Sequence, residues 1–331
     1  MAAEIDRLKA LLCKAYGSPE NLVIADVAPP ALGPGEVRIG IRACGVNYPD
    51  NLMIAGKYQV QPPLPFSPGF ELAGDILEVG DGVTRCKAGQ RVAATSMSGA
   101  MAEEICVPAA SVVPLPDEMD YVTAAGFVIA YGTSYHALKQ RAQLRPGEKL
   151  LVLGAGGGVG LTAVELGSLM GAETYAAAST VEKLELARSR GAAHFINYRE
   201  SVLREQVREL TGGQGVDVIY DPVGGELFYD CLRSVNWGGR ILIIGFASGT
   251  IPKIPANLPL LKGSSIVGVF WGTFAEREAA ASQQNMRELL AWFEQGKVRP
   301  CIARTYPLED APLAMRALAD RHAMGKLVIT I

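Results

Sequence analysis

A run of glycines between a predicted strand and a predicted helix constrains this chain more than any other feature. The apolar segment Lys149–Leu153 is predicted as a buried strand, GAGGGVG covers residues 154–160, and a helix is predicted over Leu161–Gly167. In such a turn one glycine allows a positive φ, another lets a ligand approach the backbone, and a third lets helix and strand pack closely. The turn reads Ala155-x-Gly157-x-x-Gly160, a dinucleotide-binding fingerprint with alanine in the first place.

The helix N-terminus behind this turn carries roughly half a positive charge, which attracts phosphate. A glycine-rich turn without a ligand is the alternative interpretation. The strand before the turn, the helix after it and the series of strands and helices beyond it favour the ligand. We therefore predict that the turn binds the pyrophosphate of a dinucleotide through Gly156, Gly157, Gly158, Val159 and Gly160.

The chain divides into two kinds of pattern. Between Glu36 and Val92, short β-branched runs alternate with Gly, Pro and Asp turns, which is typical of a compact all-β module. Beyond Tyr121, apolar strands alternate with amphipathic helices, which indicates a parallel sheet covered on both faces. The terminal strand GKLVITI needs a partner sheet, so we assign the tail to the β-rich part. We predict an α/β protein in which a nucleotide-binding domain, residues 125–270, interrupts a catalytic domain formed by residues 1–124 and 271–331.

Composition narrows the class of partner. The chain has 331 residues, of which 49% are apolar and 20% charged, and its net charge is −3. No basic block suggests a binder of nucleic acid or of a membrane surface, so a small-molecule partner is expected. The longest uncharged run, Tyr121–Leu138, is too polar for a membrane span and is predicted as two buried helices broken at Gly132. The N-terminus does not resemble a secretory signal, and about its first seven residues are predicted as a loose tail.

The cysteines and histidines argue against a metal site. The six cysteines and three histidines are dispersed, with no CxxC pair and no histidine at metal-ligand spacing. This pattern indicates reduced thiols in a cytoplasmic protein. Cys44, on an alternating strand, is expected to be a small buried hydrophobe rather than a nucleophile.

The end of the second parallel strand indicates which dinucleotide binds. An NAD site has an Asp or Glu there to accept from the ribose hydroxyls, whereas this chain has Ala-Ser-Thr at 178–180, followed by Lys183. Lys183 can pair with the 2′-phosphate of NADPH. It can also be a solvated helix residue, and Glu182 and Glu185 beside it weaken the case. The pattern favours NADPH over NADH.

Nearly the whole chain, from Lys9 to Ile331, resembles the zeta-crystallin-like NADPH:quinone oxidoreductases, a zinc-independent group of the medium-chain dehydrogenases/reductases. The blocks that carry the resemblance are, in order, PGEVRIGIRACGVN, PPLPFSPGFELAGDILEVGDGV, AGQRVAA, GEKLLVLGAGGGVGLTAVELG, GAAHFINYRE, YDPVGG, GGRILIIGFASG and MGKLVI. The resemblance implies a GroES-like catalytic domain and a Rossmann domain, with NADPH in the cleft. Zinc-dependent alcohol dehydrogenases of the same superfamily place a Cys ligand at the position of Asn47 and a His ligand at that of Phe70, so the resemblance also implies a site without zinc.

The resemblance further implies particular cofactor contacts. The 2′-phosphate would be met by Ser179, Lys183, Tyr198 and Arg321, the last of which can instead be a plain cation at a helix C-terminus. Thr133 would lie beside the nicotinamide. The backbone of two later segments would line the nicotinamide and ribose: Gly245, Phe246 and Ala247, and Phe270, Trp271 and Gly272.

Two residues depart from the family pattern. Glu165 stands where the family signature has Gln, and Ile54 stands where quinone reductases often carry Arg. The second departure removes a cation from the substrate-side loop, so the electron acceptor can differ from a typical quinone.

The stretch ACGVNYPDNLMIAGKY, residues 43–58, is predicted to face the substrate. Hydride transfer from NADPH needs an electrophilic carbon held nearby and a group that stabilises or protonates the product. The candidate donors are Asn47, Tyr48 and Tyr58. Tyr58 resembles the proton-donating tyrosine of enoyl-thioester reductases of the superfamily, and the alternative is that it only forms a wall. Asp50 is expected to orient the loop rather than act as a base.

These features together predict an NADPH-dependent oxidoreductase that passes hydride to quinones or α,β-unsaturated carbonyl compounds. The family commonly pairs through its last Rossmann strand, and SSIVGVF is an apolar edge strand, so a homodimer is expected. An enoyl-thioester reductase is a second hypothesis, although no basic residues cluster on the substrate loops. An NADPH-binding structural or sensing protein is a third.

Overall fold

The computed structural model describes residues 7–331, and the predicted N-terminal tail therefore lies almost wholly outside the described residues. The chain forms two compact units. The first consists of Met1–Ile129 with Pro300–Ile331, and the second of Ala130–Arg299. One unit thus interrupts the other along the sequence.

The first unit is built on a seven-stranded sheet, in the order β14-β15-β3-β4-β5-β7, with β6 also paired to β3. All pairings are antiparallel except that of β14 with β15. The strands are β3 (Glu36–Val46), β4 (Glu71–Val79), β5 (Arg91–Thr95), β6 (Glu104–Pro108), β7 (Val112–Pro114), β14 (Ile302–Pro307) and β15 (Lys326–Thr330), beside a hairpin of β1 (Leu8–Leu12) and β2 (Val23–Val27). Its helical segments are α1 (Tyr48–Ile54), α2 (Tyr121–Ala125), α11 (Ala311–Ala319) and the single turns η1 (Pro19–Asn21), η2 (Ala109–Ser111) and η4 (Leu308–Asp310).

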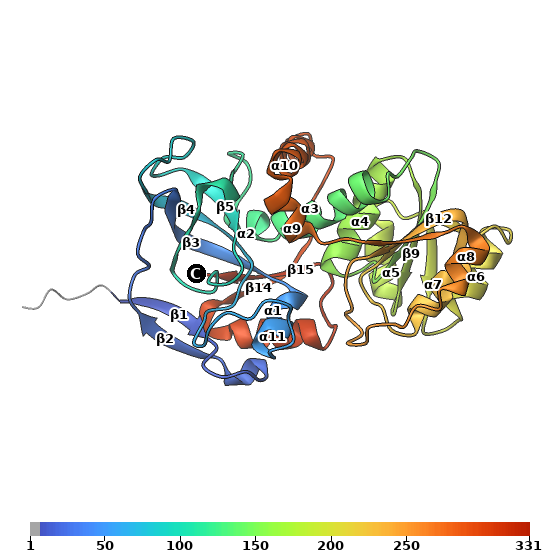
Figure 1. The fold of residues 1–331 in the computed structure, drawn as a ribbon, viewed down its shortest axis with the longest axis horizontal. Helices are drawn as coiled ribbons and strands as arrows, with labels where there is room; N and C mark the ends of the chain where they lie inside the picture. Colours follow the sequence, from blue (N-terminus) through green and yellow to red (C-terminus); the bar gives the residue numbers. More distant parts are fainter. Residues whose placement is uncertain (1–6) are drawn as a thin grey trace, which may run out of the picture. The chain divides into compact units, whose positions relative to one another are not determined.

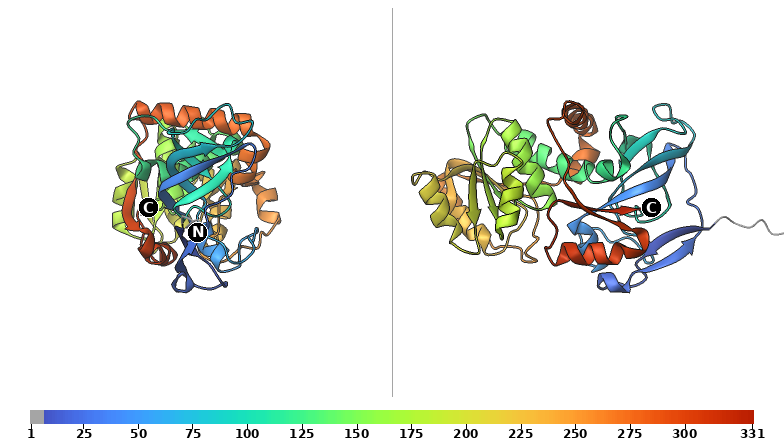
Figure 2. Two further views of the ribbon diagram at one scale, coloured as in Figure 1. Left: turned by 90° about the vertical axis from the view of Figure 1, so that its left-hand side faces the viewer. Right: turned by 180° about the vertical axis from the view of Figure 1, so that it is seen from behind.

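The C-terminal strand completes this sheet. Val328 of β15 lies opposite Gly45 of β3, and Figure 2 shows the red end of the chain beside the blue strand. The β15 side chains Leu327, Val328 and Ile329 are almost fully buried, so the strand contributes to the core as well as to the hydrogen-bond ladder. The prediction that the terminal strand joins the β-rich part is confirmed.

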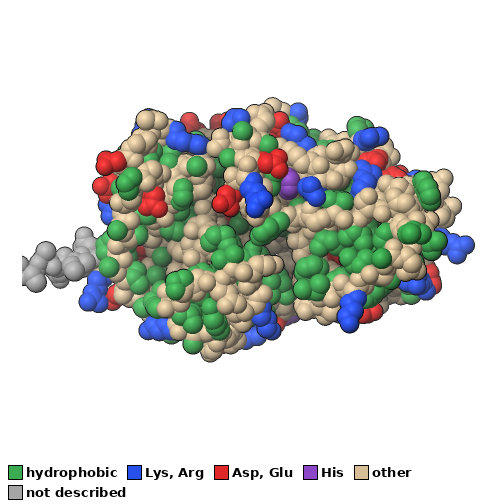
Figure 3. All heavy atoms as spheres, viewed as in Figure 1, with side chains coloured by type: hydrophobic (Ala, Val, Ile, Leu, Met, Phe, Trp, Pro, Cys, Tyr) green, Lys and Arg blue, Asp and Glu red, His purple; other side chains and the backbone are tan. Residues whose placement is uncertain are grey.

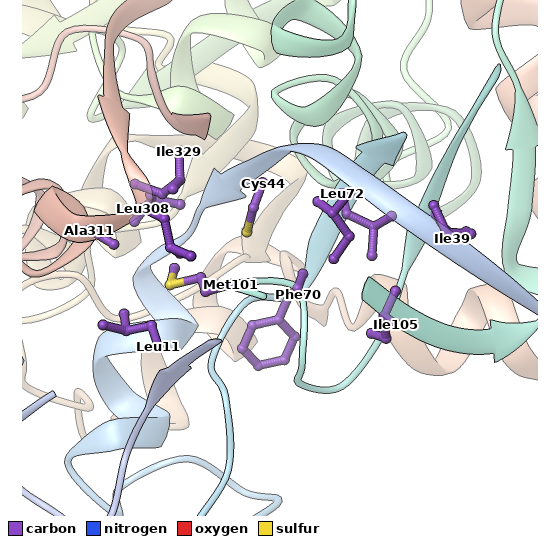
Figure 4. Packing of buried hydrophobic residues seen from close by; sticks show 14 of the residues in the cluster. Leu11, Ile39, Cys44, Phe70, Leu72, Met101, Ile105, Leu308, Ala311 and Ile329 are labelled. Carbon is purple, nitrogen blue, oxygen red and sulfur yellow. The ribbon is translucent and has the colours of Figure 1, made fainter. Parts of the chain in front are cut away.

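Cys44 belongs to the apolar core of this unit. Figure 4 shows its side chain among those of Leu72, Met101 and Ile329, which come from segments far apart in the sequence. Burial raises the pKa of the Cys44 thiol well above its usual range. The prediction of a small buried hydrophobe is confirmed.

The second unit is built on a six-stranded parallel sheet in the order β10-β9-β8-β11-β12-β13. This is the strand order of a doubly wound Rossmann sheet. The strands are β8 (Lys149–Leu153), β9 (Glu173–Ala178), β10 (His194–Asn197), β11 (Val216–Asp221), β12 (Val235–Ile243) and β13 (Ser265–Gly268). The helices are α4 (Gly158–Leu169), α5 (Val181–Arg188), α6 (Leu203–Leu210), α7 (Leu227–Ser234) and α8 (Asn257–Lys262). Helices α4 and α5 pack on one side of the sheet, and α6, α7 and α8 on the other (Figure 1).

The uncharged run around residue 130 forms two helices, as predicted, but the predicted break was wrong. Helix α2 ends before Gly126, and α3 (Val128–His136) continues into a single π-helical turn over Ala137–Arg141. Gly132 lies inside α3, where the missing side chain leaves room for Trp271: a Cβ there would come within 2.7 Å of the indole. In the described part of the chain, no helix combines the length and the apolar character needed to cross a membrane.

Residues 271–299 lie in the second unit, whereas we expected them in the first. They form α9 (Trp271–Arg277) and α10 (Ala279–Glu294). The carboxylate of Glu288 on α10 accepts a hydrogen bond of 2.6 Å from the hydroxyl of Tyr135 on α3. This pairing spans more than a hundred residues, so hydrophobic periodicity gave no sign of it.

Candidate functional site

The predicted phosphate turn lies at the carboxyl end of β8, where the strand order reverses between β8 and β11. Gly154 has a φ of +58°, and α4 begins at Gly158 with Gly157 as its N-cap. The helix thus starts three residues before the predicted Leu161. The prediction placed the start too late because glycines add nothing to the apolar periodicity from which a helix start is recognised. A Cβ at Gly160 would lie 2.2 Å from the carbonyl oxygen of Gly154, so only glycine allows this approach of helix to turn.

Three of the four residues predicted to meet a 2′-phosphate lie in this unit beside the turn. Ser179 directly follows β9, and the N–H of Tyr198 donates to the last carbonyl of β9 at 3.2 Å. The side-chain stem of Lys183 lies over Gly156, where an added Cβ would be 2.6 Å from the Cβ of Lys183. Arg321 belongs to the first unit and has a left-handed conformation with φ of +61°.

The first segment predicted to line the nicotinamide and ribose follows β12. The N–H of Ala247 donates to the carbonyl of Pro222 at 3.0 Å, and a Cβ at Gly224 would be 2.9 Å from the ring of Phe246. Asp221, at the end of β11, shapes the neighbouring turn because its carboxylate accepts from the N–H of Gly224 at 2.8 Å. The loops after β11 and β12 therefore lie side by side at the carboxyl edge of the sheet.

Thr133 and the second predicted segment meet through Gly132. The Trp271 indole packs against Gly132, the residue before Thr133 in α3. Phe270, which precedes Trp271, is about half exposed. The structure thus brings together all the cofactor residues predicted in the second unit at one edge of the sheet or on the helix beside it.

A buried hydroxyl cluster next to Thr133 was missed by the sequence analysis. Ser134 Oγ donates to the carbonyl of Val159 at 2.9 Å and lies 2.8 Å from the hydroxyl of Thr162 and 2.9 Å from that of Tyr220. These contacts fix α3 against the first turn of α4, and so fix the position of Thr133 relative to the glycine turn. The partners of Ser134 are 25, 28 and 86 residues away in the chain, so no local motif reveals them.

In the first unit, residues 43–58 form the end of β3, the helix α1 and a turn, rather than a simple loop. Asp50 on α1 is fully buried, and its two oxygens accept from the N–H groups of Asn47 at 2.7 Å and Gly69 at 2.9 Å. Burial raises the pKa of Asp50 from its ordinary 3.8 to about 7, against the opposing effect of the Asn47 hydrogen bond. With both oxygens engaged by backbone, Asp50 is placed to hold the start of α1.

A buried charged network surrounds Asn47. Glu71 Oε1 accepts from the amide nitrogen of Asn47 at 2.9 Å and from the ammonium of Lys326 at 2.7 Å. Glu71 Oε2 accepts from the N–H of Ile129, near the start of α3, at 2.9 Å. The sequence analysis missed Glu71 and Lys326, although charged residues inside the apolar blocks PGFELAG and GKLVITI were the available signal.

Tyr58 lies beside this network. Its ring packs edge-to-face on Phe70, with centroids 5.3 Å apart and an interplanar angle of 75°, a geometry worth about 1 kcal/mol. Burial, and secondarily the charge of Asp50, raises the pKa of Tyr58, so its hydroxyl remains protonated at neutral pH. Tyr48, the first residue of α1, is half-buried.

Comparison with known proteins places this arrangement in a family. The chain matches the alcohol dehydrogenase GroES-like domain over residues 33–117 and the zinc-binding dehydrogenase domain over residues 158–295. It is 37% identical over 324 residues to quinone oxidoreductase-like protein 2 of Rattus norvegicus, covering 98% of this chain and 92% of the rat protein. The chain belongs to the zeta-crystallin-like quinone oxidoreductase family.

Solved structures agree with this membership. The quinone oxidoreductase of Pseudomonas syringae is 32% identical with a TM-score of 0.93, covering 98% of this chain and all of that one. The Escherichia coli quinone oxidoreductase complexed with NADPH is 28% identical with a TM-score of 0.92, covering 98% of this chain and 99% of that one. The predicted family and the predicted pairing of a GroES-like domain with a Rossmann domain are confirmed, and the protein is an oxidoreductase of this family.

Zinc is implied by the description of one matching domain, but the residues of this family member do not fit it. The Asn47 side-chain oxygen already accepts from the Lys326 ammonium at 2.8 Å, and Phe70 offers no donor atom. A zinc ion beside a buried ammonium would be repelled by it. Within residues 7–331, no three His, Cys, Asp or Glu side chains are grouped so that they could hold a metal ion.

The structure accounts for the family departure at Glu165. Its carboxylate accepts from the hydroxyl of Tyr131 at 2.5 Å and from the guanidinium of Arg190 and the N–H of Arg299, each at 3.1 Å. A glutamate therefore forms a partly buried ion pair here. Ile54, the other departure, is 1% exposed and packs in the core of the first unit, so an arginine at this place would bury a charge.

Proposed function

We propose that this protein is an NADPH-dependent oxidoreductase that transfers hydride to a quinone or an α,β-unsaturated carbonyl compound without zinc. The observation that carries the proposal is the Lys183 stem packed over Gly156, with Ser179 and Tyr198 at the same edge of the sheet. This arrangement brings a cationic and two hydroxyl-bearing residues to the end of β9, where Ala178, Ser179 and Thr180 stand in place of the Asp or Glu that binds ribose hydroxyls in NAD sites. The Escherichia coli relative, solved with NADPH, supports the same choice of cofactor.

The residues of the second unit fit such a cofactor. The amides of Gly156, Gly157, Gly158, Val159 and Gly160, with the α4 N-terminus, would hold the pyrophosphate. Thr133 and the two segments Gly245–Ala247 and 270–272 would contact the nicotinamide and ribose. Arg321 remains a proposed partner of the 2′-phosphate. When bound, NADPH supplies a hydride from C4 of its nicotinamide.

The first unit would supply positioning and a proton. A quinone needs little acid catalysis, because it is electron-poor and its reduced form is aromatic. An enone gains hydride at its β-carbon and must then take a proton at the α-carbon. We assign that proton to Tyr58, whose raised pKa keeps it in the donating form, and we assign Asn47, Asp50 and Tyr48 to shaping the wall around the acceptor.

Steady-state kinetics with an acceptor panel test the proposal. NADPH and NADH are each compared with a simple benzoquinone, a small enone and a short enoyl-CoA. The proposal predicts turnover of the quinone or the enone with NADPH preferred. A strong preference for the thioester would support the enoyl-thioester reductase hypothesis, and tight NADPH binding without oxidation by any acceptor would support a structural or sensing role.

The Tyr58→Phe variant tests the proton donor. It keeps the ring that packs on Phe70 and removes only the hydroxyl, so folding is expected to be preserved. Enone reduction is expected to fall by about 100-fold, while quinone reduction changes little. Equal effects on the two acceptors would mean that Tyr58 only forms a wall.

We also propose that the protein is a homodimer that pairs through β13. This strand ends the parallel sheet, and β12 is its one partner among the described strands. Nearby, Leu260, Leu261 and Trp237 are 78%, 66% and 77% exposed, and apolar side chains also gather on the face of this unit drawn in Figure 3. A second copy would cover the strand edge and these side chains.

Sedimentation velocity tests the dimer. The wild-type protein is expected to sediment as a dimer, and Leu261→Asp as a monomer because a carboxylate would be buried at the interface. A wild-type monomer at micromolar concentration would reject this part of the proposal.

A further inference from the structure

Lys326 is a buried cation held entirely by oxygens of its own unit. Its side chain is 7% exposed, and Nζ lies 2.7 Å from Glu71 Oε1, 2.8 Å from Asn47 Oδ1 and 3.0 Å from the carbonyl oxygen of Val46. An ammonium has three N–H donors, and three acceptors satisfy them. The ammonium is therefore fully engaged inside the protein and is not offered to a ligand.

The partners of Lys326 come from three different places in the fold. Val46 ends β3, Asn47 precedes α1, and Glu71 begins β4, while Lys326 itself begins β15. These four residues form what we call the Lys326 cluster. Each position lies at the end of an element, so the cluster ties together three strands and the helix that follows one of them.

The cluster determines which way the Asn47 amide points. The oxygen of Asn47 faces the ammonium, and its nitrogen donates to Glu71 at 2.9 Å and to the carbonyl of Gly45 at 3.3 Å. If the amide were turned over, its NH2 group would face the ammonium and its oxygen would face the carboxylate. Both contacts would be repulsive, so the charge pair leaves one orientation for Asn47.

The orientation of Asn47 matters because Asn47 leads directly into α1. Its own N–H donates to Asp50, and Asp50 in turn accepts from Gly69, whose neighbour Phe70 packs on Tyr58. A displacement of Asn47 is therefore transmitted to α1 and to the wall that carries Tyr58. The contacts that transmit it are two hydrogen bonds between buried groups and the edge-to-face contact of Phe70 with Tyr58.

We infer that Lys326 is a positioning residue of this enzyme, whose ammonium fixes Asn47 and α1 so that the acceptor wall has one conformation. The inference rests on the proposed function. It also explains how the site is ordered although the zinc ligands at positions 47 and 70 are replaced. The Lys326 ammonium supplies one positive charge there, whereas a zinc ion would supply two. The ammonium orders the site by hydrogen bonds and cannot activate a ligand as a Lewis acid.

The test compares Lys326→Met, which keeps the length of the side chain and removes the charge, with Lys9→Met. Lys9 is a matched lysine of the same unit, but its side chain is 55% exposed and lies 4.0 Å from Glu309. For Lys326→Met we expect kcat on the acceptor to fall about 10- to 100-fold, with the KM for NADPH unchanged because the proposed cofactor residues lie largely in the other unit. Lys9→Met is expected to retain wild-type values.

Hydrogen–deuterium exchange provides a readout that does not depend on turnover. The amides of Tyr48–Ile54 are expected to exchange faster in Lys326→Met than in the wild type or in Lys9→Met. Exchange and kcat both indistinguishable from Lys9→Met would overturn the inference. If instead the wild-type enzyme turned over neither quinone nor enone, the proposed function would fail, while the exchange result would still decide whether Lys326 holds α1.

A second variant covers the possibility that Lys326→Met does not fold. Lys326→Met combined with Glu71→Gln removes both members of the buried ion pair, so neither charge is left without the other and the variant is expected to fold. Because the ammonium that orients Asn47 is still missing, kcat is expected to stay at least about tenfold below wild type. A double variant with wild-type kcat would overturn the inference.

Discussion

The two candidate regions of this protein are built in opposite ways. In the first unit, the surroundings of Asn47 are charged side chains buried against one another: Asp50, Glu71 and Lys326. In the second unit, the glycine turn exposes backbone groups, and its close contacts are possible because the glycines have no Cβ. The first region is fixed by electrostatic pairing and the second by close steric approach, so they should respond to different perturbations.

The largest expected difference is in the response to pH. The folded pKa of Asp50, about 7, lies above its ordinary 3.8, so the contribution of Asp50 to stability is complete below about pH 4 and is lost as pH rises through 7. The loss should approach about 4 kcal/mol, from 1.36 kcal/mol for each pKa unit. Burial lowers the pKa of His136, so His136 makes the unfolding free energy rise with pH, opposite to the effect of Asp50. The two contributions must therefore be separated.

Comparing variants makes this separation. Unfolding free energies from urea titrations between pH 4 and 8 are measured for the wild type, for Asp50→Asn and for Asp26→Asn, a matched exposed carboxylate. The wild type and Asp26→Asn should share the same slope, and Asp50→Asn should lack the part assigned to Asp50. If all three slopes coincide, the first region does not depend on this carboxyl group.

The second prediction separates two roles within the glycine turn. Gly160→Ala places a Cβ 2.2 Å from the Gly154 carbonyl, and it should destabilise the fold by about 3 kcal/mol through overpacking. Gly157→Ala places its Cβ 3.4 Å from the same oxygen and should leave stability within about 1 kcal/mol of wild type. Because Gly157 faces the proposed pyrophosphate, that variant should nevertheless lose NADPH affinity. Urea unfolding and NADPH fluorescence titration measure the two effects, and equal stabilities would show that the close approach is not required.

The smallest expected effect concerns cofactor choice. Gly156→Ala puts a Cβ 2.6 Å from the Cβ of Lys183, an atom fixed to the backbone of α5, so the first turn of α5 must move away from the glycine turn and take Lys183 with it. The preference for NADPH over NADH should fall about tenfold, equivalent to about 1.4 kcal/mol. In a Lys183→Gly background, which removes this Cβ together with the ammonium, Gly156→Ala should change the preference no further. If the two changes multiply instead, Gly156 acts on the cofactor directly and not through Lys183.

Much of this protein followed from the sequence. The strands and helices of the Rossmann unit can be recognised from the periodicity of their apolar residues. The turn GAGGGVG can be recognised locally, because its function depends on backbone freedom at consecutive residues. The return of the terminal strand to the β-rich unit also followed, since an apolar strand must find a sheet. The burial of Cys44 was predicted from its residue type and not from strand alternation, because Ala43 and Gly45 on either side of it are buried as well.

The tertiary structure alone decided the rest. Ser134 meets Thr162 and Tyr220, and Lys326 meets Glu71 across 255 residues, because the fold brings distant segments together and buried polar groups must find partners there. The assignment of α10 to the second unit depends in the same way on the Tyr135–Glu288 pairing. Local patterns in a sequence reflect the backbone conformation and burial of neighbouring residues. The partners of buried charges are determined only by the folded chain, because they come from segments far apart in the sequence.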